Sequence, residues 1–212
     1  MDVPTTLPAR VYLAAYDARR TRLTKTSRLG HLVRTAALEE LLIRGMIADA
    51  DGRVAVTSRE TTGDPVLDGV LQMLREASKQ RPWKHWVSRQ SGRTRTAIRD
   101  QLAAERVIRV ERHRVLGVFP RSVVTLRDAR PAKTLQASAA RVLTGKTPTT
   151  QLDPRDVALA AIAAIGELDT VCRGSVRREN RARIKELVAL SGPAVPALKK
   201  VLSEETAAAA AA

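Results

Sequence analysis

Apolar side chains recur at helical spacing along most of this chain. In residues 29–46 they follow one helical stripe, with Glu40 as the one polar break and Gly45 near the end. Residues 61–78 repeat the stripe behind Asp64-Pro65, a pair typical of a helix start. The same spacing predicts further helices over residues 7–16, 83–90, 94–105, 132–143, 153–165, 175–190 and 195–205.

Two segments break the helical pattern with short β-prone runs. Residues 47–56 contain Asp51-Gly52, a strong turn pair between two short strands. Residues 107–110 and 115–119 predict a second hairpin around Arg112-His113, with His113 exposed at the tip. The polar, basic residues 17–27 predict a loop, and the chain after Pro120 is expected to be helical throughout.

The two helix–hairpin units resemble each other at an offset of 61 residues. Leu41-x-x-Arg-Gly-Met-Ile47 superposes on Leu102-x-x-Glu-Arg-Val-Ile108. A helix that runs into a hairpin is the core of a winged-helix unit, so the pair suggests tandem winged-helix-like modules over residues 29–58 and 92–120. The prediction is a mainly α fold: one compact helical domain over residues 1–212 with short β-hairpins. It comprises a C-terminal helical part, 131–205, and a fraying alanine tail, 206–212.

Composition narrows the class of protein. With 212 residues and 44% hydrophobic side chains the chain can build a core, and it has no apolar run that could span a bilayer. One cysteine, Cys172, and three separated histidines exclude a disulfide scaffold and argue against a zinc site; Cys172 is expected to be buried. Phosphate-binding loops and nucleophile motifs are absent from the sequence, so we expect no catalytic residue, no cofactor and no enzyme activity.

Charge points to a polyanionic partner. The net charge is +15, and residues 81–130 alone hold 13 basic and 4 acidic side chains. Such a stretch attracts nucleic acid or an anionic membrane surface. The many arginines and alanines are also typical of a GC-rich genome, which explains part of the total charge without any function.

Two ordered motifs resemble the Golgi phosphoprotein 3 family. Residues 38–47 (LEELLIRGMI) match a Glu-Leu-x-x-Arg-Gly-x-Ile helix end, and residues 62–68 (TGDPVLD) match a Thr-Gly-Asp-x-x-Leu-Asp helix start. The resemblance continues through Trp86, the Leu102–Ile108 unit and residues 116–120, and covers roughly residues 7–190. The composition suggests a bacterial, actinobacterial-type member.

The resemblance implies a mostly helical, non-enzymatic adaptor. Eukaryotic members lie peripherally on the cytoplasmic face of the Golgi membrane and bind phosphatidylinositol 4-phosphate and the cytosolic tails of glycosyltransferases. Some members self-associate through the later hairpin, which implies a homo-oligomer contact here. Its residues would be Val107, Val110, Val115 and Phe119.

The family's head-group pocket maps onto named arginines. The resemblance implies that Arg34 and Arg95 belong to this pocket. The family's other basic residue aligns with Gly92, so the neighbouring Arg93 would take its place. The cations Arg22, Lys25 and Arg28 would face the anionic surface. The family's bilayer-inserting tryptophan should lie near Lys25, and this chain has no aromatic residue there. In a bacterium, phosphatidylinositol or another anionic lipid would replace phosphatidylinositol 4-phosphate.

Arg34 has two interpretations. It interrupts an apolar helix stripe, where an unpaired guanidinium is costly. It forms either a structural salt bridge, with a carboxylate such as Asp64 or Asp100, or a fork for a phosphate group. Trp83 and Trp86 are expected to pack in the core rather than to anchor the chain in a bilayer.

Three hypotheses for the function follow. The first is a cytoplasmic, peripheral membrane adaptor that binds an anionic phospholipid surface through Arg34, Arg93 and Arg95, with cargo tails as further partners. The second is a winged-helix nucleic-acid-binding protein, with residues 94–105 as recognition helix and 112–114 as wing tip. The recognition helix has only Gln101 for reading adenine, which favours the first. The third is an interaction scaffold with neither ligand.

Overall fold

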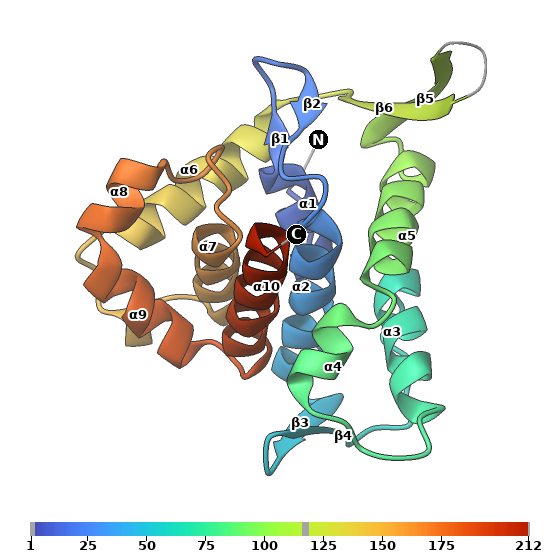
Figure 1. Ribbon diagram of the computed structural model, residues 1–212, viewed down its shortest axis with the longest axis vertical. Helices are drawn as coiled ribbons and strands as arrows, with labels where there is room; N and C mark the ends of the chain where they lie inside the picture. Colours follow the sequence, from blue (N-terminus) through green and yellow to red (C-terminus); the bar gives the residue numbers. More distant parts are fainter. Residues whose placement is uncertain (1–2, 116–118, 212) are drawn as a thin grey trace.

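Helices dominate the computed structural model, which describes residues 3–115 and 119–211, with side chains for 3–111 and 123–211 (Figure 1). Three antiparallel strand pairs interrupt them. In chain order the elements are α1 Leu7–Ala14, β1 Tyr16–Asp17, β2 Arg22–Leu23, α2 Leu29–Ile43, β3 Ile47–Ala50, β4 Arg53–Val56, α3 Pro65–Arg75, α4 Trp83–Ser88, α5 Ser91–Ala104, β5 Ile108–Val115, β6 Phe119–Leu126, α6 Arg130–Thr144, the 3-10 turn η1 Thr149–Gln151, α7 Pro154–Ile165, α8 Gly174–Glu179, α9 Arg181–Leu190 and α10 Ala194–Ala210. The prediction of a mainly α fold with short hairpins is confirmed.

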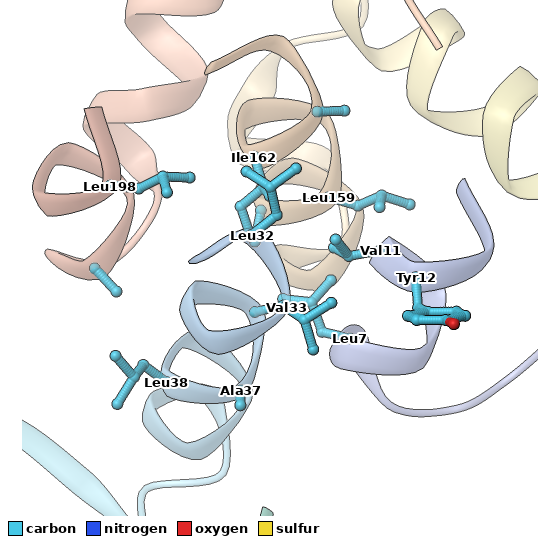
Figure 2. Close-up of a cluster of buried hydrophobic side chains, with 14 of the residues drawn as sticks. Leu7, Val11, Tyr12, Leu32, Val33, Ala37, Leu38, Leu159, Ile162 and Leu198 are labelled. Carbon is cyan, nitrogen blue, oxygen red and sulfur yellow. The ribbon is translucent and has the colours of Figure 1, made fainter. Parts of the chain in front are cut away.

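Helix α2 forms the centre of the fold. It packs against α1, α5, α7 and α10, and it is buried along nearly its whole length. Figure 2 shows Leu32 and Val33 of α2 among Leu7, Leu159 and other apolar side chains of the surrounding helices. Burying apolar surface on several sides of one helix is the main source of stability in such a core.

Two adjacent glutamates near the end of α2 join it to the N-termini of other helices. Glu39 is 2% exposed and accepts backbone N–H bonds from Gly192 (2.9 Å) and Val195 (3.2 Å) at the start of α10. Burial raises the pKa of Glu39 to about 7, although these N–H donors favour the ionised form. Glu40 is fully buried and accepts from the Leu7 N–H at the start of α1 and from Arg155 on α7. Helix N-termini favour negative charge, so both carboxylates fix α2 within the bundle.

The repeat of 61 residues is confirmed in the backbone. After α2 the Met46 N–H bonds the Leu41 carbonyl, and after α5 the Val107 N–H bonds the Leu102 carbonyl, each at 2.9 Å. The residue before each of these donors is left-handed: Gly45 has φ +67° and Arg106 has φ +59°. Both helices therefore end in the same type of left-handed turn and lead into a hairpin.

This repeat predicts a stabilising substitution. A left-handed non-glycine residue is strained, and Arg106 is exposed. We expect Arg106→Gly to raise the free energy of unfolding by about 0.5–1 kcal/mol, after glycine's larger unfolded-state entropy is subtracted. Urea unfolding followed by circular dichroism measures it. Gly45→Ala is the matched control and should destabilise the chain; equal or lower stability of Arg106→Gly would contradict the prediction.

The later hairpin differs from the predicted one. Strands β5 and β6 pair from Ile108 with Leu126 to Val115 with Phe119, so His113 pairs with Arg121 within the ladder and is not at the tip. Consecutive polar residues were misread as a turn, because the strands pair through backbone hydrogen bonds, which do not depend on side-chain polarity. The prediction that all structure after Pro120 is helical is also wrong, since β6 runs to Leu126. Residues 116–118 of the expected strand lie outside the described residues.

The structure corrects the predicted boundaries of three further segments. Residues 17–27 contain the short pair β1–β2 rather than only loop. The helix expected over 175–190 is broken at Asn180, whose side-chain amide donates to the Val176 carbonyl at 2.8 Å and competes with the helical ladder. The helix expected over 195–205 continues to Ala210, because alanine has the highest helix propensity.

Candidate functional site

Arg34 lies in the second turn of α2 and is the most buried arginine that the sequence singled out, at 2% exposure. Its Nη2 donates to the Gln90 carbonyl at 3.2 Å, and its Nη1 lies 3.8 Å from the Met73 sulfur. Its Nε is buried without a hydrogen-bond partner in the described part of the chain. Burial lowers the pKa of Arg34 to about 10, so the guanidinium is still charged at neutral pH.

Of the two interpretations of Arg34, the structural salt bridge with Asp64 or Asp100 is wrong. Among the described residues no carboxylate lies within 4.0 Å of it. Asp64 instead caps α3 by accepting from the Val66 and Leu67 N–H groups, and its second oxygen accepts from Gln101. Asp100 pairs with Arg99 at 2.7 Å. Arg34 therefore keeps a buried charge that these two candidate carboxylates do not balance.

The N-terminus of α5 lies directly beside Arg34. A Cβ added to Gly30, one helical turn before Arg34, would be 3.1 Å from the Ser91 backbone, so α2 and the first turn of α5 approach closely there. Gln90, which precedes α5, is left-handed (φ +52°) and provides no side-chain cap. A buried cation next to a helix N-terminus concentrates positive potential, which attracts an anion. Gly30 and Gln90 were not predicted as site residues; a glycine inside a helix was the available signal.

The structure brings Arg93 close to Arg34 but directs Arg95 elsewhere. Arg93 is exposed, and its Nη1 lies 3.4 Å from the Gln90 side-chain oxygen, so both arginines contact Gln90. Arg95 donates to the Thr26 carbonyl at 2.7 Å. Residues two apart on a helix point about 200° apart, so Arg93 and Arg95 cannot share one face.

The basic segment before α2 is tied to the rest of the chain. Lys25 and Arg28 both pair with Glu167, at 3.6 and 3.1 Å, and Arg28 also donates to the Thr206 hydroxyl. Arg22 lies on the exposed strand β2. Glu167 therefore offsets part of the charge of this segment, an effect that the sequence did not reveal.

The remaining residues that the sequence singled out are two tryptophans, one cysteine and four hairpin residues. Trp83 and Trp86 are each 3% exposed and Cys172 is 3% exposed, as predicted. Val107 and Val110 pack partly against the chain's own core. The side chains of Val115 and Phe119 lie outside the described residues, so the oligomer contact stays a prediction.

The described residues contain neither a membrane-spanning helix nor a cluster of metal-binding side chains. In residues 3–115 and 119–211, none of the helices is both long and apolar enough to cross a membrane. The same part of the chain contains no cluster of three or more His, Cys, Asp or Glu side chains that could hold a metal ion.

These features define a mainly helical protein with two helix–hairpin units and a buried arginine beside a helix N-terminus. The chain belongs to the Golgi phosphoprotein 3 (GPP34) family, which matches residues 7–205. No curated protein matches the sequence. The family assignment made from the two sequence motifs is confirmed.

Proposed function

We propose that this chain is a non-enzymatic peripheral membrane adaptor that binds anionic phospholipid head groups, with a phosphorylated inositol head group as the preferred ligand. One observation carries the proposal: Arg34 is buried and charged, has a free Nε, and has no carboxylate among the described residues to balance it. A phosphate oxygen would supply the missing partner through a charge-assisted hydrogen bond.

The surroundings of Arg34 suit a phosphate. Gln90, Gly92 and Arg93 are exposed around the first turn of α5, and the Gln90 carbonyl contacts Arg34, so a head group that binds there lies next to the buried guanidinium. Arg93 adds a second guanidinium, and the helix N-terminus favours the negative charge. The basic residues Arg22, Lys25 and Arg28 then add long-range attraction to an anionic surface.

The same proposal places the protein at the cytoplasmic face of a membrane, with protein tails and a second copy of the chain as further partners. The nucleic-acid alternative is less well supported. Gln101, the residue of α5 suited to reading adenine, donates to both Asp64 and Glu105 within the chain.

Vesicle co-sedimentation tests the proposal. Phosphatidylcholine vesicles that contain phosphatidylinositol 4-phosphate, phosphatidylinositol or phosphatidylserine are compared with pure phosphatidylcholine. We expect binding to the anionic vesicles, weakened about tenfold by Arg34→Met and severalfold by Arg93→Ala. Arg181→Ala on α9, at the other side of the fold, is the matched control and should bind as wild type (Figure 1).

A DNA mobility-shift assay with the same proteins tests the nucleic-acid alternative. No binding to any anionic vesicle, together with salt-sensitive binding to DNA, would overturn the adaptor proposal. Vesicle binding that Arg34→Met leaves unchanged would reject the pocket and leave only a diffuse basic surface.

A further inference from the structure

A large cleft is lined in part by the basic segment 17–26, and Arg34 is not among its lining residues. It has a volume of about 1680 Å³, and its walls are the β1–β2 hairpin, helix α6, the end of β6 and the connection from α7 to α8. Figure 1 shows the β1–β2 hairpin, α6 and the α7–α8 connection at one end of the molecule. We call this feature the basic cleft.

The lining of the basic cleft is positively charged. Among the described residues that line it, the acidic ones are Asp17 and Asp169. Four of its cations have no carboxylate partner within 4.0 Å among the described residues, whereas Arg20 pairs with Asp17 and Lys25 with Glu167. The four cations are Arg19, Arg22, Lys133 and Arg173.

Part of the lining of the basic cleft is apolar. This part consists of short aliphatic side chains and a buried thiol, and among the described residues that line the cleft none is aromatic. The apolar residues are Leu23, Val123, Val124, Ala137, Ala140, Val171, Cys172 and Val176.

Side-chain hydrogen bonds hold the walls in place. The Gln136 amide of α6 donates to the carbonyls of Ala14 (3.1 Å) and Tyr16 (2.8 Å). Thr170, from the α7–α8 connection, donates to the Ala14 carbonyl at 2.7 Å, and Thr24 donates to the Ala15 carbonyl at 2.8 Å. Three walls therefore meet at the junction of α1 and β1, which makes the cleft preformed and lowers the entropy lost on binding.

We propose that the basic cleft binds a peptide segment in which acidic side chains flank apolar ones. The volume exceeds the roughly 300–1,000 Å³ typical of small-molecule sites and suits a length of polypeptide. A lining that combines apolar and basic side chains complements such a segment in both hydrophobicity and charge. The described lining residues include no aromatic side chain, so they offer no stacking platform of the kind that single-stranded nucleic acid uses.

The proposal does not depend on the lipid site at Arg34, and its test keeps the two apart. The probe is a short fluorescent peptide that alternates glutamate and leucine, and its binding to the full chain is measured by fluorescence anisotropy. We expect saturable binding that weakens as salt rises, and no binding of a matched peptide with lysine in place of glutamate.

Two kinds of variant test whether the peptide binds in the basic cleft. The charge reversal Lys133→Glu/Arg173→Glu is expected to weaken binding about tenfold or more. Ala137→Trp, at an exposed position on α6, fills the cleft without changing its charge and should weaken binding similarly. The matched control Arg181→Glu/Lys185→Glu changes the same net charge on α9, outside the cleft, and should bind as wild type. Circular dichroism confirms that each variant is folded.

Other outcomes would overturn the proposal. Peptide binding that the cleft variants leave unchanged places the peptide elsewhere. Loss of binding to phosphatidylserine vesicles or DNA in these variants, without any peptide binding by wild type, makes the cleft a membrane or nucleic-acid surface instead. Arg34→Met should leave peptide binding intact, so failure of the lipid proposal and failure of this one are distinguishable.

Discussion

Glu40→Ala is expected to lower the free energy of unfolding by about 3–5 kcal/mol, the usual loss when one member of a buried ion-pair network is removed. The Glu40 carboxylate is fully buried and accepts from Arg44 Nε at 2.8 Å, from Arg155 Nη2 at 2.9 Å and from the Leu7 N–H at 3.2 Å. Burial alone would raise the pKa of Glu40, but the hydrogen bonds from Arg155 and Arg44 hold it below its usual value. Truncation leaves these donors without their acceptor at the junction of α1, α2 and α7.

Urea and thermal unfolding followed by circular dichroism measure this loss. For a chain of this length we expect the melting temperature to fall by roughly 6–20 °C. Glu40→Gln keeps the shape and one acceptor oxygen and should lose less, about 1–3 kcal/mol. The exposed Glu179→Ala is the matched control and should stay within about 0.5 kcal/mol of wild type. A loss below about 1 kcal/mol in Glu40→Ala would show that the network contributes little net stability.

Arg34→Met is expected to have the opposite effect and to stabilise the chain by about 1–2 kcal/mol, because it removes a buried charge without a counter-ion. No acceptor is left without a partner, since the Gln90 carbonyl also accepts from the Arg93 N–H at 2.9 Å. The sign agrees with the lowered pKa of Arg34: a base whose folded-state pKa lies below its unfolded value destabilises the fold at every pH where it is protonated.

Thermal unfolding at neutral pH checks this expectation. The melting temperature of Arg34→Met should rise by roughly 2–8 °C, while the matched control Arg181→Met on the exposed face of α9 should change little. A soluble phosphatidylinositol 4-phosphate head group should raise the melting temperature of wild type but not of Arg34→Met. Destabilisation by more than about 1 kcal/mol would show that Arg34 supports the fold rather than a ligand.

Helix α2 carries two different kinds of buried charge. Glu40 has three sets of donors and holds the bundle together, whereas Arg34 makes one carbonyl contact at 3.2 Å and one weak contact with sulfur. Natural sites often keep groups that reduce stability because a ligand requires them. This contrast is the physical basis for proposing a lipid site at Arg34.

Local chemistry made several features predictable from the sequence. Asp64 and Asp153 cap α3 and α7 as expected, because a short acidic side chain before proline bonds the first helical N–H groups. The repeated turns after α2 and α5 were visible as a repeated motif. The helices of the core followed from apolar spacing, and the order of two short motifs identified the family.

Distant contacts could not be predicted in this way. Glu40 looked like an ordinary polar break in a helix, yet Glu40 and its neighbour Glu39 reach the starts of α1 and α10, which are remote in sequence. The sequence left open whether Arg34 has a carboxylate partner, and only the packing of α2 against its neighbours shows that its contacts are the Gln90 carbonyl and the Met73 sulfur. The spacing of side chains along one element determines local structure, whereas the partner of a buried charge depends on which elements pack together.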